Sequence, residues 1–88
     1  LEVRRGFRGF LFIELQGDLM GTWICTPGKW EVNYERWEFC HFLDGYCIIT
    51  PEGEQPVHLR AGDVFVIEPG LRGTWEVVET VRKYFVFA

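Results

Sequence analysis

Short apolar segments separated by turns constrain the fold of this chain more than any other feature of its sequence. Glycine and proline recur between these segments, about every eight to twelve residues, and no long stretch repeats apolar residues at the spacing of a helix. This pattern is typical of sandwiches and barrels. We therefore predict an all-β chain with almost no helix.

The expected strands comprise residues 10–15, 20–26, 29–34, 38–43, 46–50, 57–59, 64–67, 73–78 and 81–87. Residues 10–15 and 38–43 have apolar side chains on both faces, whereas residues 29–34 alternate and form a half-exposed strand. Strands that are apolar on both faces must be covered on both sides, so they belong in two layers or in a closed sheet. The pair Asp44-Gly45 tolerates positive φ, and it predicts a two-residue hairpin turn between the fourth and fifth of these strands.

Residues 38–43 show the two-faced pattern best. Successive side chains of a strand point to opposite faces, which places Glu38, Cys40 and Phe42 together on one face. On the other face, His41 stands between two apolar side chains. This segment is therefore expected to form part of a wall that is covered on both sides.

Length and composition indicate one small domain over residues 1–88, with residues 1–9 as a loose lead-in. A chain of this length buries only about 60–65% of the surface that it exposes when unfolded. We therefore expect a homodimer, which would cover further apolar surface. The chain begins at Leu1 rather than at a methionine, which leaves open whether a segment precedes it.

Charge, hydropathy and cysteine content argue against several classes of function. The formal net charge is −4, and no run of Lys or Arg offers a footprint for nucleic acid. No apolar run approaches the roughly 18–20 residues of a membrane span, and the basic N-terminus lacks the apolar region of a secretory signal. Three cysteines without C-x-x-C spacing argue against a disulfide framework and structural zinc. We expect a cytoplasmic chain that binds neither nucleic acid nor membrane, with its cysteines buried as small apolar side chains.

Two phrases of the sequence resemble the paired motifs of the cupins. In the first, six residues separate Glu38 from Gly45, and in the second, Gly62 and Gly70 flank an apolar strand and a proline. The resemblance covers residues 21–87 and is closest to the small cupins related to ureidoglycine aminohydrolase. It implies a double-stranded β-helix, in which two antiparallel sheets roll into a jelly-roll-like barrel, and it implies dimerisation.

The cupin motifs commonly supply three histidines and one glutamate to a divalent metal, and here the glutamate alone, Glu38, is present. Depending on where the count begins, the histidine positions of the first motif fall on Val32 and Tyr34, Glu31 and Asn33, or Tyr34 and Arg36. The histidine position of the second motif falls on Gly73. His41 is out of phase with Glu38, and His58 lies outside both motifs. We therefore expect no metal and no other cofactor.

Glu38 is the strongest candidate for chemistry. Inside a barrel it would face Tyr34 and Trp75, where an ionised carboxylate is costly unless it is paired. Arg36 or Arg72 could pair with it, an amine-bearing ligand could bind it, or a raised pKa could make it a general acid or base. A purely structural glutamate is an equal alternative. We predict Tyr34, Arg36, Glu38 and Trp75 as ligand-binding residues, Glu38 as the one candidate catalytic group, and loss of binding with little loss of stability in Glu38→Gln.

Three functions remain open at this point. The first is a protein that binds a small polar metabolite in its barrel without metal, and the resemblance makes an amine, amino-acid or ureido compound the first class to test. The second is a metal-dependent enzyme of the ureidoglycine aminohydrolase type, against which the missing histidines count. The third is a ligand-free scaffold that dimerises or binds a partner. A cupin fold is compatible with all three, so whether the chain is an enzyme stays open.

Overall fold

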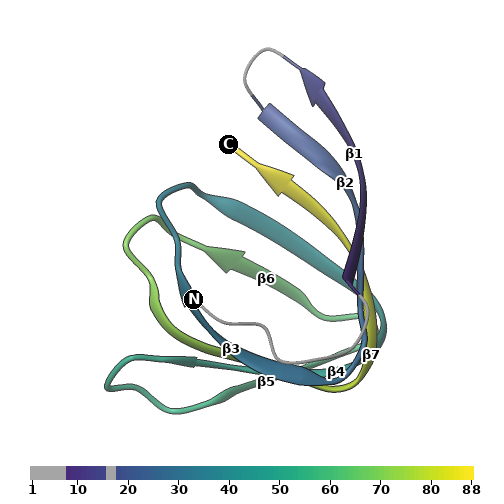
Figure 1. Ribbon diagram of the computed structural model, residues 1–88. Coiled ribbons are helices and arrows are strands. Elements are labelled where there is room, and N and C mark those ends of the chain that lie inside the picture. The colour runs from purple at the N-terminus through teal and green to yellow at the C-terminus, as the bar shows by residue number, and fades with distance from the viewer. Residues whose placement is uncertain (1–7, 16–17) are drawn as a thin grey trace.

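The computed structural model describes residues 8–15 and 18–88, and the regular elements in these residues are all strands (Figure 1). The strands are β1 (Arg8–Leu15), β2 (Asp18–Cys25), β3 (Gly28–Asn33), β4 (Glu38–Pro51), β5 (Val57–Arg60), β6 (Val64–Ile67) and β7 (Arg72–Phe87). Since this described part of the chain forms no helix, it contains no helix that could span a membrane. The prediction of an all-β fold is confirmed.

Two long antiparallel strands, β4 and β7, organise the barrel. One half of this pair is flanked by β6 and β2, with β1 beyond β2, and the other half is flanked by β5 and β3. These two groups form the two walls of a rolled sheet, and both long strands bend from one wall into the other (Figure 1). The arrangement is that of a double-stranded β-helix, as predicted.

The prediction of a hairpin turn at Asp44-Gly45 is wrong, because β4 continues through these residues as a single strand. The register against β7 shifts around them instead, which is the mark of a β-bulge. Gly45 has a φ of +92°, and a Cβ at this position would collide with the backbone at Thr80. The sequence Asp44-Gly45 favours positive φ equally in a bulge and in a hairpin turn. Here the pairing of β4 with a similarly long strand, β7, makes it a bulge.

The bulge also exchanges the two faces of β4. The side chains of Glu38, Cys40 and Phe42 point inward before it, and those of Cys47 and Ile49 point inward after it. The register shifts between Phe42 and Cys47 change the phase of the alternation in β4, so both halves of the strand keep their apolar positions toward the interior.

The two strands expected over residues 73–78 and 81–87 are likewise one strand, β7. Its inward positions keep a single phase from Trp75 to Phe85, and the exposed residues Glu79 and Thr80 lie where β7 passes the bulge of β4. Exposed polar residues at a bend resemble a turn in sequence, which explains why the strand was expected to break there. Of the lead-in expected over residues 1–9, residues 1–7 lie outside the described part of the chain, and the other two belong to β1.

Aromatic side chains fill much of the space between the walls. Trp75, which is 1% exposed, lies 5.6 Å from Trp23 and 6.4 Å from Trp30 between ring centroids. The buried apolar side chains are Trp23, Cys25, Trp30, Cys40, Phe42, Cys47, Ile49, Leu59, Ile67, Trp75, Val77, Val81 and Phe85. All three cysteines are buried, as predicted. Each buried ring removes about 150–250 Å² from water, which compensates for the shortness of the chain.

Candidate functional site

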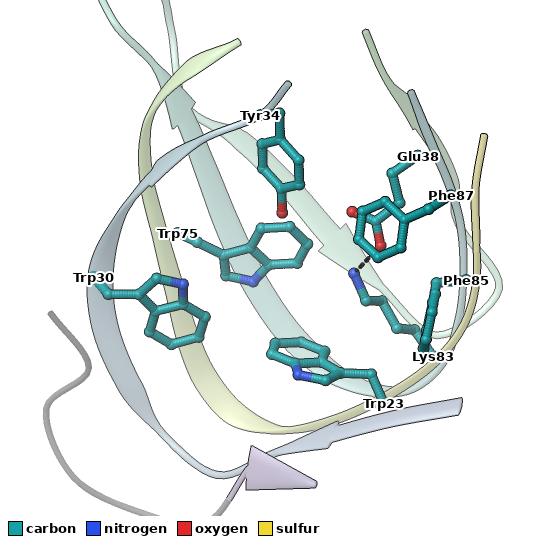
Figure 2. Close-up of a pocket in the computed structure, with 8 residues that line it drawn as sticks. All are labelled: Trp23, Trp30, Tyr34, Glu38, Trp75, Lys83, Phe85 and Phe87. Carbon is teal, nitrogen blue, oxygen red and sulfur yellow. Dashed lines mark hydrogen bonds and ion pairs between the residues drawn. The ribbon is translucent and has the colours of Figure 1, made fainter. Parts of the chain in front are cut away.

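A small cavity lies inside the barrel, at the end where Tyr34 follows β3 (Figure 2). Its volume is about 110 Å³. The lining side chains come from β2, β3, β4 and β7 and from the segment after β3, and they are Trp23, Trp30, Tyr34, Glu38, Trp75, Lys83, Phe85 and Phe87. Tyr34 and Phe87 are half-buried and the other six are buried, so these two side chains form the rim toward solvent.

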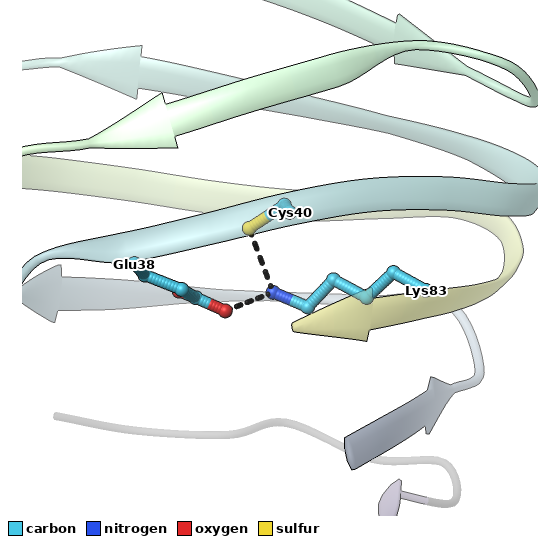
Figure 3. Close-up of polar contacts among 3 residues, drawn as sticks. All are labelled: Glu38, Cys40 and Lys83. Atoms are coloured by element: carbon cyan, nitrogen blue, oxygen red, sulfur yellow. Dashed lines mark hydrogen bonds and ion pairs between the residues drawn. The ribbon is translucent and has the colours of Figure 1, made fainter. Parts of the chain in front are cut away.

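One ion pair lies in this otherwise aromatic cavity. Lys83 Nζ donates a hydrogen bond of 2.8 Å to Glu38 Oε2, and the two side chains are only 4% and 1% exposed (Figure 3). The same ammonium lies 4.4 Å from the ring centroid of Trp75 and 4.7 Å from that of Trp23. A carboxylate and two ring faces therefore compensate the charge of Lys83 for its lost hydration.

The register of β4 and β7 explains how the two charges meet. Lys83 pairs across the ladder with Phe42, and Glu38 pairs with Phe87. The long lysine side chain therefore extends along the wall toward Glu38, and Nζ passes 3.4 Å from the sulfur of Cys40 (Figure 3). The pair joins residues that are 45 positions apart in the sequence.

The two oxygens of the Glu38 carboxylate have different surroundings. Oε1 is buried and accepts no hydrogen bond from the described residues. The Tyr34 hydroxyl points into the same space (Figure 2). Burial, and after it the negative charge of Glu38, raises the pKa of Tyr34 above its ordinary value of 10.0. Tyr34 is therefore a protonated hydroxyl that faces a carboxylate oxygen in need of a donor.

The thiol of Cys40 is protonated at neutral pH. Burial raises the pKa of this thiol from 9.0 to about 12, although the positive charge of Lys83 acts in the opposite direction. Because the thiolate is the reactive form, Cys40 is a poor nucleophile here. The environment agrees with the interpretation of Cys40 as a small buried side chain.

Of the four residues predicted to bind a ligand, the structure brings Tyr34, Glu38 and Trp75 together around the cavity. Arg36 is exposed and does not line the cavity, so it is not placed as expected. Arg36 and Arg72 were possible partners of Glu38 from the sequence, and the structure shows an ion pair between Glu38 and Lys83.

Sequence reasoning missed Lys83, although a signal for it exists. In the segment Val81-Arg-Lys83-Tyr-Phe85, the lysine has the same phase as two apolar residues, which places all three on the inner face. A charged side chain in the phase of the core is uncommon, and it deserved to be considered as a partner for a buried carboxylate.

The residues around Glu38 do not fit the metal that the cupin resemblance implies. Among the described residues, no three His, Cys, Asp or Glu side chains come close enough together to hold an ion. His41 lies on the outer face against Tyr84, and the exposed His58 forms a hydrogen bond of 2.6 Å with the Tyr46 hydroxyl. A lysine ammonium contacts Glu38 where a metal would need further imidazole or carboxylate donors.

Comparison with known proteins agrees with this fold. The EutQ-like cupin domain family matches residues 14–85. The EutQ protein of Clostridium difficile superposes with a TM-score of 0.81 at 15% identity, over 93% of this chain and 62% of that one. A DUF861-family protein of Thermotoga maritima has a TM-score of 0.70 at 30% identity, over 73% of each chain. A cupin superfamily protein of Desulfitobacterium hafniense has a TM-score of 0.79 at 13% identity, over 99% of this chain and 82% of that one.

The curated proteins contain no match to the chain. The chain spans less than two thirds of the length of the C. difficile EutQ structure. The structural likenesses below 25% identity establish the fold alone.

Proposed function

This chain belongs to the EutQ-like cupin family, and we propose that it binds a small polar metabolite through Glu38 in its barrel. The supporting observation is the buried oxygen Oε1 of Glu38, which has no hydrogen-bond partner among the described residues. A buried acceptor without a donor costs about 1–3 kcal/mol, and more when it is charged. A ligand that donates a hydrogen bond to Oε1 removes this cost.

The charge of the site favours an uncharged ligand. The Glu38–Lys83 pair is neutral as a whole, so a ligand with a net charge would add an uncompensated charge to a largely buried cavity. Two of the three N–H groups of Lys83 contact Glu38 and Cys40, which leaves the third for an acceptor. A ureido or primary amide group presents N–H and C=O side by side, and it matches this acceptor and donor better than a free amine or amino acid.

The size of the cavity limits the ligand further. An apolar cavity of about 150 Å³ holds benzene, and the present cavity has about 110 Å³. The bound group therefore has about six non-hydrogen atoms or fewer. The aromatic lining provides flat faces for a planar group of this kind.

We expect calorimetric titration to detect binding of urea or acetamide, and the variant Glu38→Gln to weaken this binding at least about tenfold, since it exchanges a charged acceptor for a neutral one. Glu31→Gln is the matched control, because Glu31 is an exposed carboxylate on β3. Tyr34→Phe, which removes the facing hydroxyl and keeps the ring, provides a second test. Circular dichroism establishes that each variant is folded before titration.

Binding that is equal in the parent protein, Glu38→Gln and Glu31→Gln would contradict the proposal, as would an absence of binding across a panel of small amides, ureido compounds and amines. Stronger binding of ethylamine or glycine than of acetamide would agree with Glu38 as a ligand-binding residue. It would contradict the argument that the neutral ion pair favours an uncharged ligand. The donors around Glu38 in the described part of the chain do not favour the alternative of a metal-dependent aminohydrolase.

We also propose that the outer face of the wall formed by β6, β4, β7 and β2 contacts a second copy of the chain. Two rows of side chains cross these strands in register, and they are Val66, Phe39, Val86 and Met20 in one row and Val64, His41 and Tyr84 in the other. Four of these residues are exposed apolar or aromatic side chains. Sheet faces of this composition pack against each other in sandwiches, and a two-fold axis would place the same rows on both sides.

Val66→Glu should convert a dimer to a monomer in analytical ultracentrifugation, because it introduces a charge into the middle of this face. Val78→Glu is the matched control, since Val78 is a similarly exposed valine of β7 outside the two rows. A parent protein that sediments as a monomer, or a dimer that survives Val66→Glu, would contradict the proposed face.

A further inference from the structure

Beyond reversible binding, we propose that Lys83 is a reactive amine that forms a Schiff base with a small aldehyde in the barrel cavity. The proposal uses the cavity described above, but it does not depend on the preference for ureido or amide ligands. It arises from the amine of Lys83, which reversible binding uses as a hydrogen-bond donor but not as a nucleophile. The carbonyl compound has about six non-hydrogen atoms or fewer, for the reason of volume given above.

Lys83 meets the geometric requirements of such an amine. Its Nζ lines the cavity, and the side chain is only 4% exposed. Contacts to Glu38 Oε2 at 2.8 Å and to the Cys40 sulfur at 3.4 Å fix the position of the nitrogen. Lysines desolvated in apolar pockets are the ones that proteins use for Schiff bases, and Glu38 provides an acceptor for the proton that the ammonium must lose before it can attack.

Glu38 can move all the protons that the reaction needs. It first takes a proton from Lys83 across the 2.8 Å contact, which gives the nitrogen a free lone pair. The nitrogen lone pair then attacks the carbonyl carbon, the C–N bond forms as the C=O π bond breaks, and the carbonyl oxygen takes the proton that Glu38 had accepted. The nitrogen gives a second proton to Glu38, which leaves a neutral carbinolamine. Return of a proton through Glu38 to the hydroxyl group releases water, and the C=N bond forms.

The overall reaction balances without an oxidant or a reductant. The lysine ammonium and the aldehyde give an iminium and one water, so the positive charge beside Glu38 is conserved. The ring faces of Trp23 and Trp75, which lie 4.7 and 4.4 Å from Nζ, stabilise the iminium as they stabilise the ammonium. The protonated Tyr34 hydroxyl faces the same space and can donate to the carbonyl oxygen while negative charge develops there.

The sequence provides an internal control for the test, because the chain has two lysines, Lys29 and Lys83. Lys29 is exposed on β3. The full chain is incubated with acetaldehyde and sodium cyanoborohydride, which reduces an imine to a stable secondary amine, and peptide mass mapping follows the modification of each lysine. We expect Lys83 to be modified at least tenfold faster than Lys29.

Variants and a larger probe complete the design. Glu38→Gln should slow the modification of Lys83 at least tenfold without changing that of Lys29, and Tyr34→Phe should slow it several-fold. Benzaldehyde, which exceeds the volume of the cavity, should modify Lys29 alone. Equal rates at both lysines, or modification of Lys83 only after unfolding in urea, would overturn the proposal.

Titration of acetamide on the same preparation separates this inference from the proposed binding function. Acetamide binding without trapping at Lys83 would overturn the Schiff base and leave the binding proposal intact. Trapping at Lys83 without acetamide binding would support the reactive amine and remove the preference for amides.

Discussion

Replacing Lys83 with methionine is expected to lower the free energy of unfolding by about 3–5 kcal/mol, because it leaves the carboxylate of Glu38 buried without its partner. The double variant Glu38→Leu with Lys83→Met should recover most of this loss, since it removes both charges and leaves apolar side chains in an aromatic cavity. Urea unfolding followed by tryptophan fluorescence measures both values.

The exposed ion pair of Arg82 and Asp44 gives a matched comparison for the buried pair. Arg82 contacts Asp44 at 2.9 Å, but the two side chains are 51% and 60% exposed. Arg82→Met should therefore cost less than about 1 kcal/mol. If Lys83→Met lowers the free energy of unfolding as little as Arg82→Met does, the buried pair is not coupled as described. The same conclusion follows if the loss in the double variant equals the sum of the losses in Glu38→Leu and in Lys83→Met.

This pair also corrects an expectation drawn from the sequence, that Glu38→Gln affects binding with little loss of stability. Glu38 is bound to Lys83 at 2.8 Å, so the substitution leaves an ammonium buried without its counter-ion. We now expect Glu38→Gln to lower both ligand affinity and the free energy of unfolding, the latter by several kcal/mol, as for other broken buried pairs.

The second large effect is a loss of stability in alkaline solution. Burial raises the pKa of both Cys40 and Cys47 from 9.0 to about 12. Between these values the unfolded chain loses thiol protons that the folded chain keeps, so the stabilisation is complete below pH 9 and is lost as the pH rises toward 12. Each thiol contributes about 4 kcal/mol at about 1.36 kcal/mol per pH unit. Two such contributions are comparable with the whole stability of a typical domain.

Urea unfolding as a function of pH tests this effect. The free energy of unfolding of the parent protein should fall steeply above pH 9, and the double variant Cys40→Ala with Cys47→Ala should keep its value until Tyr34 begins to ionise in the unfolded chain near its ordinary pKa of 10.0. The same steep fall in the double variant would show that other groups cause the alkaline unfolding.

The strand pattern and most of the inner face could be predicted from the sequence because they depend on local alternation. Glu38, Tyr34 and Trp75 were identified as pocket residues, since a side chain's face follows from its place in a strand. The bulge at Gly45 could not be told from a hairpin, because both need positive φ. The difference lies in the length of β7, which a local signal does not contain.

The contact between Glu38 and Lys83 could not be predicted from the local sequence, for a different reason. Lys83 lies opposite Phe42, and it reaches Glu38 only because the two strands run antiparallel in one particular register. Pairing registers between distant segments depend on the whole fold. Arg36, which was predicted to bind a ligand, is exposed and lies outside the cavity.

The two long strands have a consequence for how a molecule reaches the cavity. Because β4 and β7 belong to both walls, the backbone joins the two walls where these strands bend. Of the side chains that line the cavity, Tyr34 and Phe87 are only half-buried, and both lie outside this junction. A ligand that enters the barrel would therefore pass these two side chains, and rotation of the two rings would set the width of its path.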